Sequence, residues 1–333
     1  MAVQIFPRKA RESSSHADED HAIADTAMDT DMTAPTSLLR VDPARAVEDV
    51  DEEIFLLWTL NAMPSSDAGL GYIDPNHDSL FVRIGAHGWR SATRRSQLER
   101  PSLNDDEGDI VELSQDVTSL RSSKGNTGSV VWRSTLHLAL AIRQGRLFHL
   151  DRLRHATVLE LGSGTGALAA MLASRVHKWV ATDQDELVPL IRRNLGRTTA
   201  AANAEACALD WFDFLRPPST AFRDRNLERI LSRFDQPNAD GGGGGGGERY
   251  PDLILCADCV YNPSLFDALT ATLAALTRPR HTVVVVVAEM RTDEGISDFL
   301  HAWRASLPDG GWRILSLEDR LAKGFVVFAA WRS

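Results

Sequence analysis

The stretch TVLELGSGTG, at residues 157–166, decides the fold of this 333-residue chain. It begins with an apolar run of strand length and ends in three glycines at every second position, Gly162, Gly164 and Gly166. The following residues, 167–173, read ALAAMLA, which favours a helix. Glycine lets the backbone of such a turn approach a ligand closely and adopt a positive φ. Strand, glycine turn and helix together predict the first unit of an α/β, Rossmann-like sheet.

The glycine pattern by itself fits two kinds of ligand. Gly162, Gly164 and Ala167 also satisfy the dinucleotide-binding pattern G-x-G-x-x-G/A. Glu160 argues against a dinucleotide, because the strand of a dinucleotide site is usually apolar at that position. Asp183 ends the next strand-like run, 21 positions after Gly162. That separation suits a carboxylate that accepts hydrogen bonds from both hydroxyls of a ribose.

A second apolar run ends in polar residues near position 258. Residues 252–263 read DLILCADCVYNP, so a predicted strand leads into Asp258 and Tyr261 before Pro263 opens a helix. The carboxyl ends of parallel strands lie at one edge of a sheet, where α/β proteins bind their ligands. We therefore expect the D-x-x-Y stretch to lie at the same edge as the glycine turn.

These motifs resemble a known family. ELGSGTG at 160–166, TD at 182–183 and DCVY at 258–261 are similar to the class I, seven-β-strand S-adenosylmethionine-dependent methyltransferases, and more narrowly to the protein-lysine methyltransferases with a D-x-x-Y motif. The sequence CADCVYN around Asp258 and the long N-terminal region most resemble the fungal ribosomal lysine N-methyltransferase 5 branch. The resemblance implies a seven-stranded sheet with an antiparallel last strand, S-adenosyl-L-methionine as cofactor, and a large-subunit ribosomal protein as substrate.

The resemblance also implies roles for single residues. Asp258 and Tyr261 match the motif that borders the lysine pocket and are the expected catalytic residues. We assign Asp258 to orienting the acceptor and placing charge, and Tyr261 to the pocket wall as a hydrogen-bonding partner. Ala257 is expected against the cofactor. The residues expected to bind the cofactor are Trp132, Glu160, Gly162, Ser163, Gly164, Asp183, Trp211 and Ala257.

Some of these residues have structural roles as alternatives. Asp183 is alternatively a structural strand end, and Trp132 is equally compatible with burial in the core, because Trp is highly buried on average. Trp211 is alternatively a hydrophobic cap. Glu289 and Arg291, which follow a valine-rich run, either line the substrate mouth or pair with each other at the surface.

The charge of Asp258 raises a question about the chemistry. A free lysine has a pKa of about 10.4 and is protonated at neutral pH. Its attack on a methyl group requires the neutral amine, which desolvation in an aromatic pocket favours. A carboxylate beside the nitrogen favours the ammonium form instead. The sequence therefore does not assign Asp258 as a general base.

Composition sets the organisation of the chain. Residues 1–47 are acidic and poor in large apolar residues, which predicts a disordered tail. We expect an N-terminal extension of a helix, short strands near 79–84 and 109–115, and loops at 48–126, and the methyltransferase domain at 127–333. A flexible insertion at 217–249 contains a candidate helix at 223–234 and a run of seven glycines. Strands are expected near 157–162, 179–183, 205–209, 252–257, 281–289, 312–318 and 324–331, and helices near 166–177, 185–195, 263–277 and 293–306.

Bulk properties exclude several classes of protein. The net charge of −10 disfavours direct nucleic-acid binding and suits a basic protein substrate. No apolar run approaches the roughly 20 residues that span a bilayer, and three cysteines indicate a reducing compartment, so we expect a cytoplasmic protein. Cys256 and Cys259 are spaced C-x-x-C but lack further ligands at matched spacing, so no metal is expected.

Three other functions stay open. A small-molecule methyltransferase would share every cofactor residue, and only the D-x-x-Y stretch argues against it. A nicotinamide-dependent oxidoreductase would share the glycine turn, but Glu160 and the final pair of strands oppose it. A non-catalytic binding protein on the same fold is opposed by the presence of Gly162, Gly164 and Asp183.

Overall fold

The structure is a computed structural model of the chain, and it describes residues 37–61, 71–99, 108–122, 127–234, 250–307 and 311–333. All of these belong to one compact unit, Ala34–Ser333. The glycine run Gly241–Gly247 and most of the expected acidic tail lie outside the described residues.

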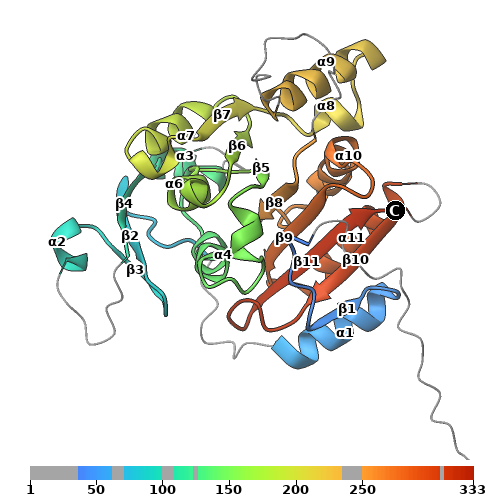
Figure 1. Cartoon of the computed structure of the whole chain (residues 1–333), viewed down its shortest axis with the longest axis horizontal. Coiled ribbons are helices and arrows are strands. Elements are labelled where there is room, and N and C mark those ends of the chain that lie inside the picture. Colours follow the sequence, from blue (N-terminus) through green and yellow to red (C-terminus); the bar gives the residue numbers. More distant parts are fainter. Residues whose placement is uncertain (1–36, 62–70, 100–107, 123–126, 235–249, 308–310) are drawn as a thin grey trace, which may run out of the picture. The chain divides into compact units, whose positions relative to one another are not determined.

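A sheet of eight strands, in the order β1-β10-β11-β9-β8-β5-β6-β7, forms the centre of this unit (Figure 1). Five neighbouring strands from β9 to β7 are parallel, and β11 runs antiparallel to both β9 and β10. The predicted seven-stranded sheet with an antiparallel last strand is therefore confirmed. Its strands are β5 (Thr157–Leu161), β6 (Lys178–Asp183), β7 (Ala204–Ala208), β8 (Leu253–Ala257), β9 (Val283–Glu289), β10 (Trp312–Leu317) and β11 (Phe325–Arg332).

Burial on both faces explains the valine-rich sequence of β9. Val283, Val285 and Val287 belong to one hydrophobic cluster, whereas Val284 and Val286 belong to a second. Alternate side chains thus enter the cores on opposite faces of the sheet, which is the arrangement expected of a central parallel strand. β-branched side chains suit such a pleated, fully buried surface.

Helices cover both faces. The first cluster includes side chains of α4 (Arg133–Arg143), α6 (Ala167–Leu172) and α7 (Val188–Leu195). The second includes side chains of α1 (Val50–Asn61), α8 (Phe212–Leu215), α9 (Thr220–Leu231), α10 (Phe266–Leu276) and α11 (Asp293–Ala305). The short helices α2 (Arg95–Leu98), α3 (Val117–Ser122) and α5 (Leu150–Leu153) belong to the connections. No helix among the described residues is long and apolar enough to cross a membrane.

The N-terminal region contributes more structure than the sequence predicted. Strand β1 (Ala44–Ala46) pairs with β10 at the sheet edge, so ordered structure begins inside the range 1–47 that was expected to be a tail. Its three residues are too few for a recognisable alternation. Glu53 of α1 accepts a hydrogen bond from Arg45 Nε at 2.8 Å, and Arg320 donates to the backbone carbonyls of Arg40 and Asp42. Side chains distant in sequence therefore hold this short strand.

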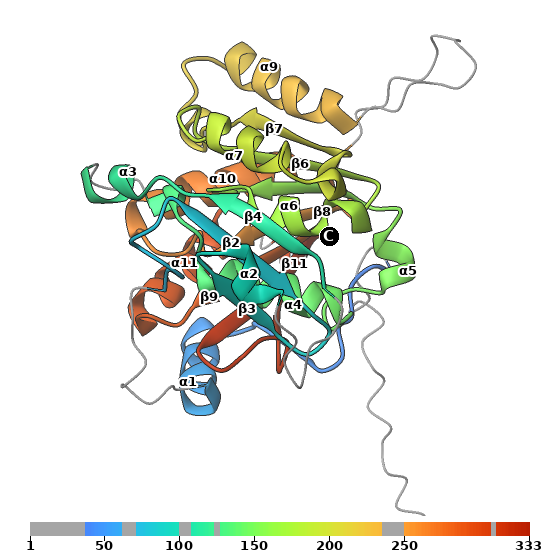
Figure 2. The same cartoon turned by 90° about the vertical axis from the view of Figure 1, so that its left-hand side faces the viewer.

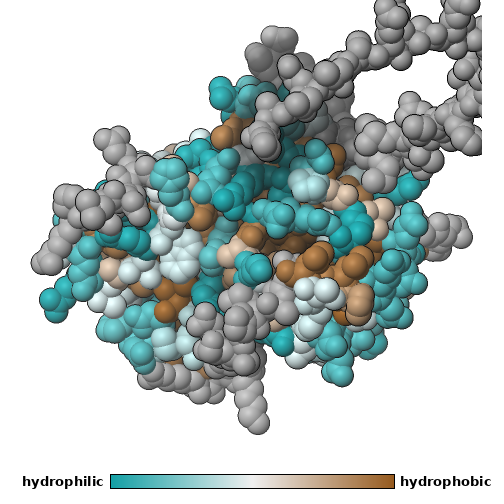
Figure 3. Space-filling view, turned by 90° about the horizontal axis from the view of Figure 1, so that it is seen from below, coloured by the Kyte–Doolittle hydropathy of each residue, from teal (hydrophilic) through white to brown (hydrophobic). Residues whose placement is uncertain are grey.

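A second sheet, β3-β2-β4, packs against α4, α6 and α7 (Figure 2). Strands β2 (Ser79–Ile84) and β4 (Ile110–Ser114) match the two predicted strands of the extension, and β3 (Trp89–Ala92) was not predicted. On α1, Phe55 and Leu60 are exposed, and apolar residues gather on the side of the molecule that Figure 3 shows.

The expected insertion at 217–249 is partly a regular helix. Helix α9 begins after Ser219, whose Oγ accepts a hydrogen bond from Phe222 N. Its C-terminal residues Ile230 and Leu231 are buried in the second cluster. The helix expected at 223–234 is thus present, but the prolines at 217 and 218 and the glycine run after it gave no sign that its last turn packs in the core.

Candidate active site

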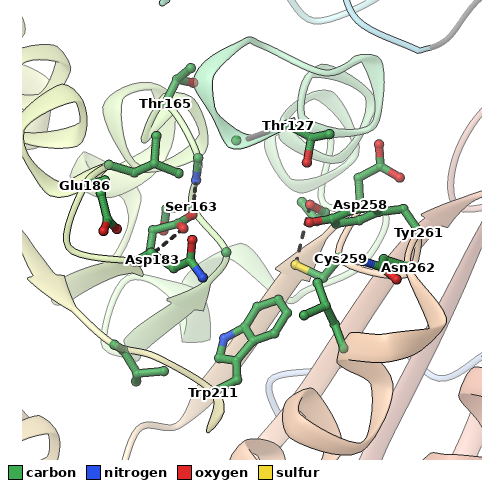
Figure 4. Close-up of a pocket in the computed structure, with 18 of the residues that line it drawn as sticks. Thr127, Ser163, Thr165, Asp183, Glu186, Trp211, Asp258, Cys259, Tyr261 and Asn262 are labelled. Atoms are coloured by element: carbon green, nitrogen blue, oxygen red, sulfur yellow. Dashed lines mark hydrogen bonds between the residues drawn. The ribbon is translucent and has the colours of Figure 1, made fainter. Parts of the chain in front are cut away.

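A cavity of about 1020 Å³ opens at the carboxyl ends of the parallel strands β5 to β8. This is the size of a site for a ligand as large as a nucleoside derivative. One end is formed by the glycine turn and the residues after β6 and β7, and the other by the residues after β8 and β9. Figure 4 shows Asp183 and Asp258 on opposite sides of the cavity, with Trp211 between them.

The glycine turn requires glycine because its φ values are positive and other parts of the chain lie against it. Gly162 and Gly164 have φ of +64° and +55°, a region that disfavours other residues. A Cβ on Gly162 would lie 2.7 Å from Cys259 Sγ, and one on Gly164 would lie 2.8 Å from the carbonyl oxygen of Gly128. Gly128 belongs to η2 (Thr127–Ser129), which packs on the turn. The turn is thus closed on two sides and faces the cavity on the third.

Asp183 lies where the sequence predicted, at the end of β6 on the cavity wall. Its Oδ2 accepts a hydrogen bond from Gly164 N at 2.7 Å, and its Oδ1 accepts one from Gln184 N at 2.8 Å. Burial raises the pKa of Asp183 to about 6, although these two hydrogen bonds lower it. The carboxylate thus links the glycine turn to β6 and keeps acceptor capacity toward the cavity.

Glu160 lies elsewhere. Its side chain is buried beneath the glycine turn and is not part of the cavity wall. Trp179 Nε1 donates a hydrogen bond to Glu160 Oε2 at 2.8 Å, and burial raises the pKa of the carboxyl group to about 8. The structure therefore does not bring Glu160 together with the other expected cofactor residues, because the alternation of β5 directs it away from the cavity.

The remaining expected cofactor residues line the cavity. Ser163, Trp211 and Ala257 come from the glycine turn, the start of α8 and the end of β8. The Trp211 ring lies close to the turn, since a Cβ on Gly162 would be 3.3 Å from its Cζ2 atom. Trp132, which precedes α4, also lines the cavity, but its ring lies at the end formed by β8 and β9.

Asp258 has an unusual backbone. It is buried and has a φ of +61°, a left-handed conformation that Asp and Asn adopt more readily than most residues. Its backbone N–H donates to the carbonyl of Val287 at 2.8 Å, which joins the turn after β8 to β9. This conformation interrupts the strand and sets the side chain at the cavity. Backbone strain of this kind is concentrated at functional sites.

Arg291 forms a bidentate ion pair with Asp258. Its Nη1 and Nη2 atoms donate to the two carboxylate oxygens at 2.9 and 2.7 Å. Nη2 also lies 3.1 Å from Glu289 Oε2, and Glu289 Oε1 accepts from Arg133 Nη2 at 2.5 Å. The sequence left open whether Glu289 and Arg291 line the mouth or pair together. The structure shows that Arg291 does both.

Aromatic rings complete this end of the cavity. The Arg291 guanidinium carbon lies 5.2 Å from the ring centroid of Trp132, and the Tyr72 ring meets Trp132 edge-on at 6.0 Å. Tyr261 is 42% exposed, and burial of the rest raises the pKa of its phenol above the ordinary value, while a hydrogen bond with Thr127 lowers it. Sequence reasoning missed Tyr72, which lies in a loop without any motif.

The three cysteines lie in the interior of the protein. Cys207, Cys256 and Cys259 are buried and form no disulfide. Within the described residues, no group of three or more His, Cys, Asp and Glu side chains is arranged to hold a metal ion.

Comparison with known proteins identifies the family. The chain matches the family model described as lysine methyltransferase over residues 113–232 and 247–305, more than half of its length. The protein belongs to the lysine methyltransferase family. The matched residues include η2, the glycine turn, Asp258 and Arg291, whereas Tyr72 lies before them.

Curated relatives are similar at modest identity. Ribosomal lysine N-methyltransferase 5 of Kluyveromyces lactis is 25% identical over 268 residues, which cover 69% of this chain and 80% of the relative. The protein-lysine N-methyltransferase EFM3 of Chaetomium thermophilum is 28% identical over 193 residues, 55% of this chain and 49% of the relative. A Schizosaccharomyces pombe protein named diaminohydroxyphosphoribosylamino-pyrimidine deaminase is 27% identical over 261 residues, 78% of this chain. The chain spans about half the length of the last two relatives.

Proposed function

We propose that this protein is an S-adenosyl-L-methionine-dependent protein-lysine N-methyltransferase. The observation that carries the proposal is a cavity that has the glycine turn with Asp183 at one end and Asp258 with Tyr261 at the other. A transfer reaction needs two binding ends whose ligands meet between them. Membership of the lysine methyltransferase family supports the choice of acceptor.

The residues at the glycine-turn end of the cavity fit S-adenosylmethionine. The glycine turn lines the cavity at Gly162 and Gly164, and Asp183 offers carboxylate oxygens for ribose hydroxyls. Trp211 provides an aromatic surface for the adenine ring. The chemistry that S-adenosylmethionine supplies when bound is a methyl group on a sulfonium sulfur. Glu160 lies beneath the glycine turn and supports it through the hydrogen bond that it accepts from Trp179.

At the other end, Asp258 and Tyr261 orient the acceptor. Asp258 is fixed by Arg291 and by its own backbone hydrogen bond, so its position does not depend on the substrate. Tyr261 and Trp132 form apolar walls that desolvate a lysine side chain. Positioning of two reactants in line supplies much of the rate enhancement in such a displacement, and no residue needs to form a covalent intermediate.

The finer part of the proposal concerns the target. We infer a large-subunit ribosomal protein in the cytoplasm as the substrate. The name of the Kluyveromyces lactis relative, of which this chain covers 80%, supports a ribosomal target. The net charge of −10 suits a basic partner.

Methyl transfer to isolated large ribosomal subunits tests both parts. Subunits from cells lacking the protein are incubated with the full chain and S-adenosylmethionine labelled with tritium on the methyl group. We expect one labelled protein, with the label on lysine after hydrolysis. Label on lysine of a non-ribosomal protein in total extract would leave the activity standing and overturn the target. Label on a small molecule alone would overturn the lysine assignment.

A further inference from the structure

The ion pair between Asp258 and Arg291 bears on the protonation state of the acceptor. Both oxygens of Asp258 already accept hydrogen bonds from Arg291, and the Asp258 side chain is only 4% exposed. A carboxylate free to pair with a lysine would hold it as an ammonium ion, which has no lone pair for attack. In this structure, Arg291 already compensates the negative charge of Asp258.

The other charged groups near Asp258 do not alter this balance. Glu289 pairs with Arg133 of α4 as well as with Arg291, so the four side chains alternate in sign and sum to zero. Asp183 faces the same space from β6, and Cys256, Cys259 and Tyr261 come from β8 and the turn after it. Burial lowers the pKa of Arg291, but its bonds with Asp258 and Glu289 raise it further, so the guanidinium keeps its charge.

Several contacts fix Arg291 in place. Its guanidinium group lies over the Trp132 ring, and its Nη2 atom, which binds Asp258, also donates a hydrogen bond to Glu289. Gly71, with a φ of +92°, passes so close that a Cβ there would collide with the Glu289 carboxylate and the Arg291 guanidinium. An arginine held on three sides at the wall of a cavity is more than a surface ion pair, which typically contributes little to stability.

We propose that Arg291 is a positioning residue that neutralises Asp258, so that the cavity accepts the substrate lysine as a neutral amine while Asp258 keeps a fixed orientation. This inference rests on the proposed function. The ammonium ion first releases its proton to water. The nitrogen lone pair then forms the new N–C bond as the C–S bond breaks, and the electrons of that bond remain on sulfur as a neutral thioether. The methylated ammonium product can release a second proton.

The test compares four proteins: wild type, Arg291→Gln, the double variant Asp258→Asn with Arg291→Gln, and Arg133→Gln as the matched control. Arg133 belongs to the same network and has nearly the same side-chain exposure, 30% against 31%, but does not contact Asp258 in the pairs that the structure forms. Arg291→Lys is added, because it restores the charge without the bidentate geometry. Melting temperature and affinity for S-adenosylhomocysteine show that each variant is folded.

The first readout is the pH dependence of kcat with large ribosomal subunits as acceptor, since kcat reports ionisation within the complex. In Arg291→Gln, the uncompensated Asp258 should raise the apparent pKa of the acidic limb by about 1–3 pH units, the effect of an opposite charge nearby. The double variant should return the limb to its wild-type position at a lower kcat. Arg291→Lys should shift it less than Arg291→Gln, and Arg133→Gln should not shift it.

The second readout needs no methyl transfer. Butylammonium, a charged mimic of the lysine side chain, is titrated at pH 7 into each protein saturated with S-adenosylhomocysteine, and binding is followed by ligand-observed NMR. Arg291→Gln should bind it at least about tenfold more tightly than wild type, corresponding to one pKa unit. The double variant should lose that gain.

Equal binding of butylammonium by wild type and Arg291→Gln, or a kcat profile that falls uniformly at every pH, would overturn the inference. The two readouts also separate it from the proposed function. The expected butylammonium series together with no lysine methylation would leave the charge compensation standing and remove the lysine methyltransferase activity.

Discussion

The two ends of the cavity are built in different ways. At the glycine-turn end, the glycines and Asp183 come from one continuous βαβ unit, residues 157–183, and Trp211 joins them from the start of α8. The other end is assembled from four separated segments, which carry Tyr72, Trp132, Asp258 and Arg291. A local motif can therefore specify a cofactor, whereas recognition of the acceptor depends on contacts between distant parts of the chain. The acceptor end should accordingly vary more easily among proteins that share the cofactor end.

Asp258→Asn should affect the two ends of the cavity most differently, with a large loss of turnover and little change in cofactor affinity. Asn tolerates the positive φ of this position, so the backbone strain that Ala would add is avoided. Loss of the charge and of the bidentate pair should misplace the acceptor and reduce turnover by about 100-fold or more. Affinity for S-adenosylhomocysteine should change by less than about twofold, because Asp258 lies at the other end of the cavity.

Methyl transfer and calorimetry on the same preparation measure both quantities. Full turnover by a stable Asp258→Asn protein would remove the D-x-x-Y stretch from the catalytic assignment. A joint loss of melting temperature and cofactor affinity would make Asp258 structural.

The reciprocal change is Asp183→Ala. If Asp183 binds both ribose hydroxyls, its removal takes away two hydrogen bonds to a charged group, each contributing about 1.5–3 kcal/mol. Affinity for S-adenosylhomocysteine should fall by about 100-fold or more, while turnover at saturating cofactor should recover toward wild type. Calorimetric titration gives the affinity directly. An unchanged affinity would confine Asp183 to its two backbone hydrogen bonds.

The difference between the ends also explains what the sequence could predict. All seven core strands were predicted within two residues, because their apolar runs are bounded by turn residues and glycines. Gly162, Gly164 and Asp183 followed from spacing within one unit. Glu160 was placed on the correct strand but was expected to bind the cofactor. The sequence pattern does not show that Trp179 binds its carboxyl group beneath the turn.

Contacts over long sequence distances were not predictable in the same way. Nothing local indicates that Arg291 reaches back 33 positions to Asp258, or that Tyr72 pairs with Trp132. Strand β1 is likewise defined by its partner β10 and by an arginine near the C-terminus rather than by its own three residues.

A smaller effect on the cofactor end is expected from pH. The pKa of Asp183 is about 6, above its ordinary value of 3.8, because of burial. As the pH falls through 6 the carboxylate becomes protonated and loses acceptor capacity for the ribose hydroxyls. Affinity for S-adenosylhomocysteine should therefore fall by about tenfold between pH 7 and pH 5. Calorimetry at several pH values checks this, and Asp183→Asn should abolish the dependence. The same fall in Asp183→Asn would assign it to another group.

The smallest effect concerns stability, and it comes from Glu160 beneath the turn. Its folded-state pKa of about 8 exceeds the ordinary value of 4.5, so between these values the folded protein holds a proton that the unfolded chain has lost. The stabilisation is complete below about pH 4.5 and is lost as the pH rises through 8.

Glu160→Gln stays neutral and can still accept the Trp179 hydrogen bond. Its melting temperature relative to wild type should therefore rise by several degrees between pH 5 and pH 8, since about 1 kcal/mol corresponds to roughly 2–4 °C in a domain of this size. Thermal scans across that range measure the difference, with Glu186→Gln, an exposed acid on the cavity rim, as control. A difference that stays constant with pH would show that Glu160 does not titrate beneath the turn, and the support of the cofactor end would then rest on the Trp179 hydrogen bond alone.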